Sequence, residues 1–246
     1  MSMVSVRGVT KSFPVDGGVV NALSAVELDI ASGEFVSIIG PSGCGKSTLL
    51  RILAGLEQQT AGDITWQARQ GRDKVGFVFQ QPVLLPWKSS LDNICFALEA
   101  FGTKGQAAQM EGRRLLKLVG LEQFADALPR QLSGGMQQRV AIARALSYDP
   151  HILLMDEPFG ALDLLTRDKM NDELAEIWAK TGKTIVLVTH SVEEAAYLSD
   201  RVAVMSARPG VIKRFYDVPF ARPRSEATKL LPEFHRLMAD LRQDLK

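Results

Sequence analysis

One stretch decides the fold: Phe35-Val36-Ser37-Ile38-Ile39-Gly40-Pro41-Ser42-Gly43-Cys44-Gly45-Lys46-Ser47. The first five residues form a short apolar run, the pattern of a buried strand. The remainder matches G-x-x-x-x-G-K-[ST], the phosphate-binding P-loop pattern. Lys46–Leu56 then carries its leucines and isoleucine at helical spacing. A buried strand, a glycine-rich loop and a helix in this order predict a phosphate cradle.

Each part of this loop has a chemical reason. Glycines let the backbone turn tightly and approach phosphate oxygens closely. Consecutive N–H groups at a helix N-terminus form an anion site. Lys46 can reach the β- and γ-phosphates as a point charge, and Ser47 can offer its hydroxyl to Mg²⁺. The alternative is a chance glycine-rich turn, which the flanking strand and helix disfavour. The predicted nucleotide contacts are Gly40, Pro41, Ser42, Gly43, Cys44, Gly45, Lys46, Ser47 and Thr48.

Composition limits the class of protein. The 246 residues suffice for one large domain, or one domain with an insert. A formal net charge of +1 argues against broad attraction to nucleic acid or anionic membranes. No apolar run approaches the ~20 residues that cross a bilayer, and the first residues lack a signal-peptide core. Cys44 and Cys95 suggest no disulfide framework. We therefore expect a cytoplasmic protein. If it serves a membrane, it does so through a partner.

Strand and helix patterns alternate outside the middle of the chain. The expected strands are Val4–Val9, Leu23–Ile30, Phe35–Ile39, Lys74–Phe79, His151–Met155, Thr184–Thr189 and Arg201–Met205. The expected helices are Lys46–Leu56, Leu91–Phe101, Gln106–Val119, Met136–Ser147, Thr166–Lys180 and a charged amphipathic one over Ser225–Leu245. This alternation indicates an α/β core with a parallel sheet, and the helical middle indicates an insert.

An acidic pair, Asp156-Glu157, ends the apolar strand that begins at His151. Strands deliver residues to their carboxyl edge, where ligands bind in open α/β sheets. Asp156 is suited to hold the hydration shell of Mg²⁺, and Glu157 to polarise an attacking water as general base. Taken alone, the pair fits a solvated turn equally well. The P-loop upstream favours the chemical interpretation.

A second glycine motif, Leu132-Ser133-Gly134-Gly135-Met136, opens another helix. Ser-Gly-Gly at a helix N-terminus is a good anion site, yet this one belongs to the helical insert. The P-loop already provides one phosphate-binding site for a nucleotide. A second motif suited to phosphate therefore suggests a composite site that another copy of the chain closes. The alternative is an ordinary N-cap at Ser133.

Over nearly its whole length the chain resembles an ATP-binding-cassette (ABC) ATPase. Leu132–Met136 is similar to the LSGGQ signature of that family and departs from it at Met136, which removes a side-chain amide. The resemblance implies a P-loop NTPase (RecA-like) core with a parallel sheet, an N-terminal antiparallel β subdomain and an inserted α-helical subdomain. It divides the single ATPase domain into a nucleotide-binding core (1–88 and 149–220), a helical signature subdomain (89–148) and a C-terminal helical tail (221–246).

The resemblance also assigns roles to further residues. Phe13 matches the aromatic residue that stacks on adenine, although it also fits a core phenylalanine. Gln80 matches the Q-loop glutamine, which contacts Mg²⁺ or the attacking water. Ala161-Leu162-Asp163 matches the D-loop at the dimer interface, and His190 matches the switch histidine that faces the γ-phosphate. The implied sets are Glu157, His190 and Gln80 for catalysis; Phe13, the P-loop residues 40–48, Ser133, Gly134 and Gly135 for ATP; and Ser47, Gln80 and Asp156 for Mg²⁺.

The implied function is ATP hydrolysis that energises a membrane transporter. Gln80–Trp87 matches the region that grips a coupling helix of the membrane subunit, and its leucines and Trp87 suit a partner pocket or, alternatively, local core packing. LLPW at 84–87, PFGALD at 158–163 and the following Leu165-Thr166-Arg167 resemble importers of nitrate, taurine, sulfonate and bicarbonate. An exporter or lipid-transport ATPase, and a soluble DNA-repair or ribosome-associated ATPase, remain alternatives. The substrate cannot be read, because the ATPase does not contact it.

The implied partners follow from the same resemblance. They are a second cassette, identical or related, that closes on ATP; integral membrane permease subunits; and, indirectly, a periplasmic solute-binding protein. No nucleic-acid partner is implied. The implied location is the cytoplasmic face of the inner membrane, where the chain is held through the permease.

Overall fold

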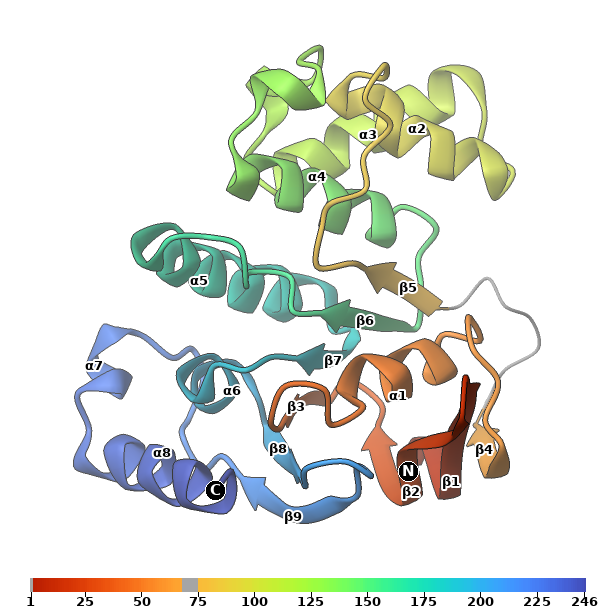
Figure 1. The fold of residues 1–246 in the computed structure, drawn as a ribbon. Helices are drawn as coiled ribbons and strands as arrows, with labels where there is room; N and C mark the ends of the chain where they lie inside the picture. Colours follow the sequence, from red (N-terminus) through yellow and green to blue (C-terminus); the bar gives the residue numbers. More distant parts are fainter. Residues whose placement is uncertain (1, 68–74) are drawn as a thin grey trace. The chain divides into compact units, whose positions relative to one another are not determined.

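The computed structural model describes residues 2–67 and 75–246. The chain divides into two compact units, one formed by Met1–Gln70 with Thr184–Lys246 and the other by Gly71–Lys183. We call them the first unit and the second unit and describe each by itself (Figure 1). The expected α/β class is confirmed, whereas the three-part division proposed from the sequence stays a prediction.

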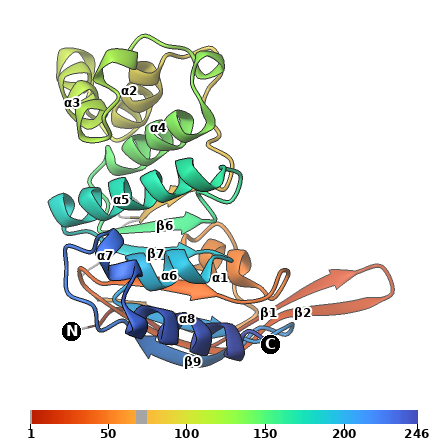
Figure 2. The ribbon, with the colours of Figure 1, turned by 90° about the vertical axis from the view of Figure 1, so that its left-hand side faces the viewer.

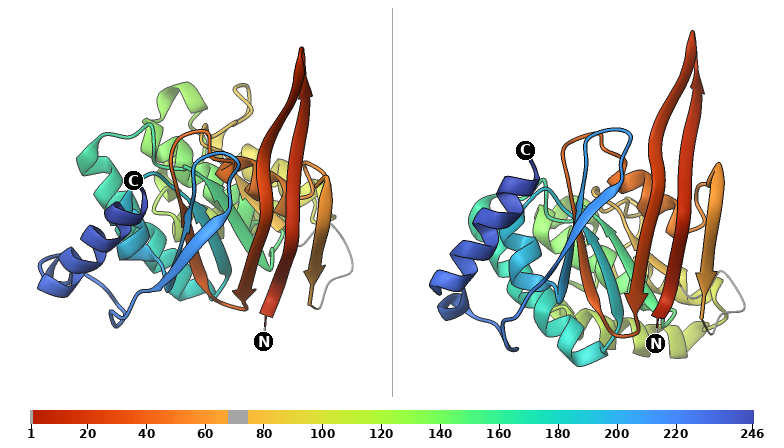
Figure 3. Two further views of the ribbon diagram at one scale, coloured as in Figure 1. Left: turned by 60° about the horizontal axis from the view of Figure 1, so that its bottom comes forward. Right: turned by 90° about the horizontal axis from the view of Figure 1, so that it is seen from below.

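An antiparallel sheet of three strands begins the first unit. Its order is β2 (Gly18–Ala31), β1 (Ser2–Val15) and β4 (Ala61–Trp66). β1 and β2 form a long hairpin, drawn in red in Figure 3, which turns at Gly17. The strands expected over Val4–Val9 and Leu23–Ile30 are correct but too short. β4 was not expected, because its alternation of exposed and half-buried residues leaves no fully apolar face.

The second sheet of the first unit has the order β7 (Thr184–Val188), β3 (Phe35–Ile39), β8 (Arg201–Met205) and β9 (Ile212–Asp217). The first three strands are parallel, and β9 runs antiparallel to β8. β3 and β7 are buried at every residue, which explains their continuous apolar runs. β9 was missed because half of its residues are charged and exposed.

The helices of the first unit are α1 (Lys46–Leu53), α6 (Val192–Leu198), α7 (Glu226–Lys229) and α8 (Pro232–Asp244). α6 packs on β3, and α8 packs on α6 (Figure 2). The continuous helix expected over Ser225–Leu245 is wrong. The chain leaves the helical conformation at Leu231, whose extended backbone precedes Pro232, and Pro232 then starts α8.

The second unit pairs β5 (Val75–Val78) in parallel with β6 (Ile152–Asp156). Lys74, the first residue of the strand expected there, lies outside the described residues. Helices α2 (Ser90–Ala100), α3 (Gly105–Leu118) and α4 (Gly134–Leu146) pack on one another (Figure 1). Short 3₁₀ turns at Glu122–Phe124 and Pro129–Gln131 connect α3 to α4. α5 (Leu164–Thr181) packs on α4, so the helical middle of the chain is confirmed.

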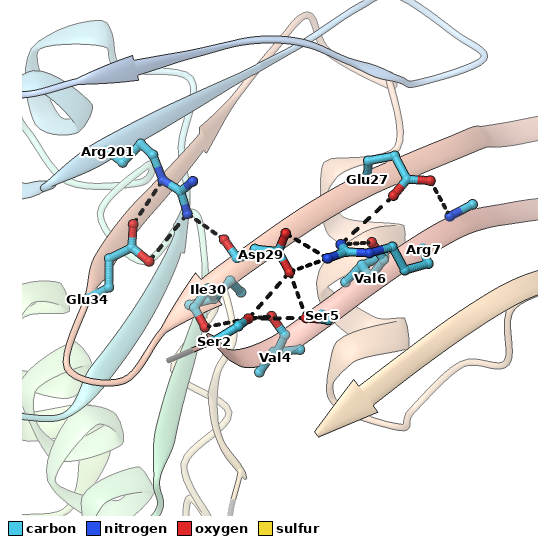
Figure 4. A network of polar contacts seen from close by, with 11 residues as sticks. Ser2, Val4, Ser5, Val6, Arg7, Glu27, Asp29, Ile30, Glu34 and Arg201 are labelled. Atoms are coloured by element: carbon cyan, nitrogen blue, oxygen red, sulfur yellow. Dashed lines mark hydrogen bonds and ion pairs between the residues drawn. The ribbon is translucent and has the colours of Figure 1, made fainter. Parts of the chain in front are cut away.

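A polar network joins the two sheets of the first unit (Figure 4). Arg7 on β1 donates to both carboxylate oxygens of Asp29 on β2, at 2.7 and 2.8 Å, and Ser5 donates to Asp29 at 2.6 Å. Arg201 on β8 donates to the carboxylate of Glu34 and to the carbonyl of Asp29. The hydrogen bonds from Arg7 and Ser5 lower the pKa of Asp29.

The network predicts a small loss of stability in acid. The pKa of Asp29 in the folded protein lies below its unfolded value of about 4. Its contribution to the free energy of unfolding is therefore complete above about pH 4 and is lost as the pH falls through the folded pKa. The carboxylate is half exposed, so Asp29→Asn is expected to cost less than about 1 kcal/mol at pH 7. Melting curves at pH 7 and at about pH 3 test this, with Asp16→Asn in the β1–β2 turn as control. A difference between Asp29→Asn and wild type that is as large in acid as at pH 7 would contradict it.

Among the described residues, none of the helices is both long and apolar enough to cross a membrane.

Candidate functional site

The glycine-rich loop curls between β3 and α1 in the first unit. Gly43 and Gly45 have φ values of +73° and +107°, which other residues adopt only with strain. A side chain at Gly45 would lie 2.8 Å from the carbonyl oxygen of Ala22 and 2.7 Å from Leu23. Gly45 is also the N-cap of α1, so the loop delivers its backbone N–H groups to the start of that helix. The backbone geometry thus meets the requirements of the predicted cradle.

Lys46 lies inside this loop. Its side chain is only 5 % exposed, and its Nζ donates to the carbonyl oxygens of Gly40 at 2.8 Å and Pro41 at 3.1 Å. Cys44 is buried beneath the loop, where a side chain at Gly40 would meet its sulfur at 2.8 Å. Ser47 and Thr48 lie half-buried in the first turn of α1. The ammonium group of Lys46 is therefore held within the loop at the N-terminus of α1, where the sequence predicts that phosphate binds.

His190 reaches the same sheet edge as the loop. The parallel register of β3 and β7 pairs Ile38 with Val188, so Gly40 and His190 each follow two residues later at the carboxyl edge. His190 is exposed. This edge is where open α/β sheets bind ligands, and the structure brings these two predicted site residues to it.

Phe13 lies near the outer end of β1, where it is half-buried rather than in the core. The ammonium group of Lys11 lies 4.7 Å from the centre of its ring. Lys11 is itself held by Glu57 and by the carbonyl of Gln58, both at 2.7 Å. An accessible ring of this kind can stack on a planar base, which is the role predicted for it.

The acidic pair and the predicted Q-loop glutamine meet in the second unit. Because the register of β5 and β6 pairs Val78 with Met155, Gln80 and Glu157 follow at the same level. The Gln80 Nε2 lies 3.5 Å from the Glu157 Oε2, a long contact between an amide donor and a carboxylate. Glu157 has a φ of +46°, a strained conformation for a residue with a side chain. Strain of this kind gathers at functional sites. Asp156 is buried at the end of β6.

The second glycine motif opens α4. Ser133 is the N-cap, and its Oγ accepts from the N–H of Met136 at 3.3 Å, so the capping alternative holds. Ser133 and Gly134 are nevertheless exposed, and Gly135 is buried where a side chain would meet Thr166 at 3.0 Å. The thirteen-residue helix α4 thus begins at an N-terminus that Ser133 caps and at which Ser133 and Gly134 are exposed.

Arg167 lies in the Leu165-Thr166-Arg167 run that resembles importer ATPases, but the sequence assigns it no individual role. Its guanidinium donates to the carbonyl oxygens of Phe159 at 3.3 Å, Gly160 at 3.4 Å and Leu162 at 3.0 Å. These carbonyls belong to the turn that follows Glu157 and runs through the predicted D-loop. Asp163 then caps α5 by accepting from Thr166. The sequence does not indicate this contact, because it depends on the carbonyls of a turn five to eight residues before Arg167.

Comparison with known proteins decides the family. The family described as ABC transporter matches residues 23–160. The taurine import ATP-binding protein TauB of Rhizobium johnstonii is 48 % identical, over 92 % of this chain and 89 % of that protein. The aliphatic sulfonates import ATP-binding protein SsuB 1 of Pseudomonas syringae pv. syringae is 49 % identical, over 94 % and 92 %. The chain belongs to the ABC transporter family.

A solved structure agrees with this assignment. A dimeric ATP-binding cassette in a post-hydrolysis state, bound to ADP and Pi, matches with a TM-score of 0.77 and 37 % identity, over 89 % of this chain and all of that one. The P-loop NTPase fold expected from the sequence is thereby confirmed, and the cassette is an ATP-binding protein and ATPase of this family. The individual roles predicted for its site residues stay predictions.

Proposed function

We propose that this cassette is the ATP-hydrolysing subunit of a membrane importer. One observation carries the ATP part: a loop between buried β3 and α1, with positive φ at Gly43 and Gly45, that holds Lys46 at the helix N-terminus. ATP would bind with its phosphates on the backbone N–H groups that the loop from Gly40 to Thr48 offers, and with its adenine on Phe13. The relatives named as importers of taurine and of aliphatic sulfonates support the transport part and suggest a small sulfonate-like solute.

Mg²⁺ fits the chemistry of the predicted donors. Ser47, Gln80 and Asp156 offer hydroxyl, amide and carboxylate oxygens, the hard ligands that Mg²⁺ prefers alongside nucleotide phosphates. Bound Mg²⁺ would neutralise charge on the phosphates. Glu157 would polarise the attacking water, Gln80 would orient it, and His190 would face the γ-phosphate.

We propose that the site is completed by a second cassette, a copy of this chain or a related one. The exposed Ser133–Gly134 N-terminus of α4 would close on the γ-phosphate held by the partner. The dimeric cassette structures among the similar proteins support this assembly. Closure would then follow ATP binding as a ligand-driven shift in population.

We infer that the segment that follows Gln80 docks on a permease. Trp87 is 73 % and Val83 is 60 % exposed, while Leu84 and Leu85 are half-buried. Val83 has a φ of +44°, which is strained for a β-branched residue. An exposed tryptophan in a strained segment favours a partner pocket over the alternative of local core packing.

Two side chains hold this segment in place. Fully buried Asn93 on α2 donates to the carbonyls of Leu85, Lys88 and Ser89 and accepts from the Leu85 N–H at 2.8 Å. Arg144 on α4 donates to the carbonyls of Val83 at 2.9 Å and Pro82 at 3.2 Å. Burial lowers the pKa of Arg144. The segment is therefore fixed in shape, which reduces the entropy lost on docking. The cassette would sit on the cytoplasmic side of the membrane through this contact, and the assembled importer would include a periplasmic binding protein.

A matched pair of variants tests the proposal. Trp87→Asp is expected to abolish co-purification of a polytopic membrane protein with tagged cassette from detergent-solubilised native membranes, because a buried unpaired carboxylate is costly. Leu230→Asp changes a residue that is 77 % exposed in the first unit and should leave co-purification unchanged. ATP binding should be normal in both. Recovery of ribosomes or DNA instead of a membrane protein would contradict the transport assignment.

A further inference from the structure

The turn between β8 and β9, Ser206–Val211, lies against the phosphate cradle. It is closed by its own hydrogen bonds: the Ser206 N–H donates to the Val211 carbonyl at 2.9 Å, and the Val211 N–H donates to the Ser206 Oγ at 3.0 Å. Nothing in the predicted chemistry uses this turn. Both the turn and the cradle belong to the first unit.

Gly210 binds this turn to β2 and packs against the cradle. Its N–H donates to the Ala22 carbonyl at 2.9 Å, and its carbonyl accepts from the Ser24 N–H at 3.0 Å. A side chain at Gly210 would lie 2.1 Å from the carbonyl oxygen of Cys44, a clash that backbone movement alone could relieve. The absence of a side chain therefore lets the turn touch the loop backbone directly.

Arg208 extends from the turn onto the loop. Its Nε and Nη2 donate to the carbonyl oxygen of Gly43 at 3.1 and 2.9 Å. The guanidinium is exposed to solvent. Two N–H groups of one guanidinium thus donate to a single carbonyl of the cradle, from a residue 165 positions away in the sequence.

The contact has a physical consequence for anion binding. A cradle binds phosphate through its N–H groups, so its carbonyls must be turned away and need partners of their own. Lys46 donates to the carbonyls of Gly40 and Pro41, and Arg208 donates to that of Gly43. The Cys44 N–H itself donates to the Pro41 carbonyl at 3.3 Å, a long hydrogen bond that a bound phosphate would have to replace. A donor on the Gly43 carbonyl also polarises the peptide that carries the Cys44 N–H. It further restrains Gly43, whose missing side chain otherwise leaves its backbone free.

We propose that Arg208 is a positioning residue of the cradle: from behind the loop it sets the Gly43–Cys44 peptide for binding the β-phosphate of the nucleotide. This rests on the proposed binding of ATP at residues 40–48. Arg208 acts through the loop backbone and does not touch the base. Removal of the Arg208 side chain therefore weakens the binding of every ligand that carries a diphosphate group, to a similar extent.

The experiment measures binding of fluorescent MANT-ADP by the full chain, and competition by inorganic pyrophosphate. Arg208→Ala should raise both dissociation constants about 3- to 10-fold, because an exposed charged hydrogen bond is worth less than a buried one. Arg208→Lys, which keeps one donor and the charge, should recover part of the loss. In ATP turnover, KM should rise while kcat at saturating ATP stays within about twofold of wild type. Arg236→Ala, which removes an equally exposed charge on α8, should change nothing.

The outcomes separate this proposal from the assignment of the ATP site. If the wild-type protein fails to bind MANT-ADP, or if the Lys46→Ala variant binds it as tightly as wild type, the ATP site itself is misplaced. If wild type binds but Arg208→Ala has a dissociation constant within twofold of it, the role of Arg208 is overturned. If Arg208→Ala and Arg208→Lys weaken MANT-ADP binding equally and both lower the melting temperature, the contact is only structural. That result would also overturn the proposed role of Arg208.

Discussion

Glu157→Gln is expected to lower ATP turnover about 10²- to 10⁴-fold, the range that a general base contributes, while ATP affinity stays near that of wild type. The substitution keeps the shape of the side chain and removes the carboxylate that we propose polarises the attacking water. If, as proposed, the cassette dimer closes on ATP and reopens on hydrolysis, the variant should also accumulate an ATP-bound dimer. Phosphate release measures the first effect, and size-exclusion chromatography with ATP measures the second.

The structure supports Glu157 as the residue to change. Its left-handed backbone costs about 1–3 kcal/mol, which persists only where the surrounding structure enforces it. Gln80 contacts its carboxylate, and Arg167 holds the turn that follows it. Glu176→Gln on α5 is the matched control, since Glu176 is exposed and pairs with Lys180 in the same helix. Near-normal hydrolysis in Glu157→Gln would refute its role as general base.

Lys46→Ala is expected to weaken ATP binding about 10- to 100-fold. Charge-assisted hydrogen bonds to phosphate are worth about 1.5–3 kcal/mol, and each 1.4 kcal/mol is tenfold in the dissociation constant. Calorimetric titration with ATP measures this directly. The effect should be larger than that of Arg208→Ala, because Lys46 would contact phosphate itself whereas Arg208 acts through the backbone.

Two further variants make the result on Lys46 specific. Lys180→Ala removes an exposed charge on α5 and should leave ATP affinity unchanged. Lys46→Met keeps most of the buried volume, which separates the loss of charge from the cavity that alanine leaves. If Lys46→Ala binds ATP with unchanged affinity, the cradle does not lie at residues 40–48.

Buried strands and the glycine loop could be predicted from the sequence because their signals are local. β3, β7 and β8 are short apolar runs, and the helices of the second unit carry clear helical spacing. β4 and β9 could not be found this way, since each gains its stability from pairing with one neighbour while much of its surface stays exposed. The single C-terminal helix failed at Leu231-Pro232, where a local break overrides the amphipathic pattern.

The sequence by itself determined the motifs from which the chemistry of this cassette is predicted: the glycine loop with Lys46, the acidic pair and the Ser133–Gly135 motif are contiguous residues with their own spacing. Tertiary structure alone decided what supports them. Arg208 reaches Gly43, and Asn93 and Arg144 fix the segment around Trp87, through hydrogen bonds to backbone carbonyls. Every residue offers the same carbonyl, so such contacts leave no pattern in the sequence and exist only once the chain has packed.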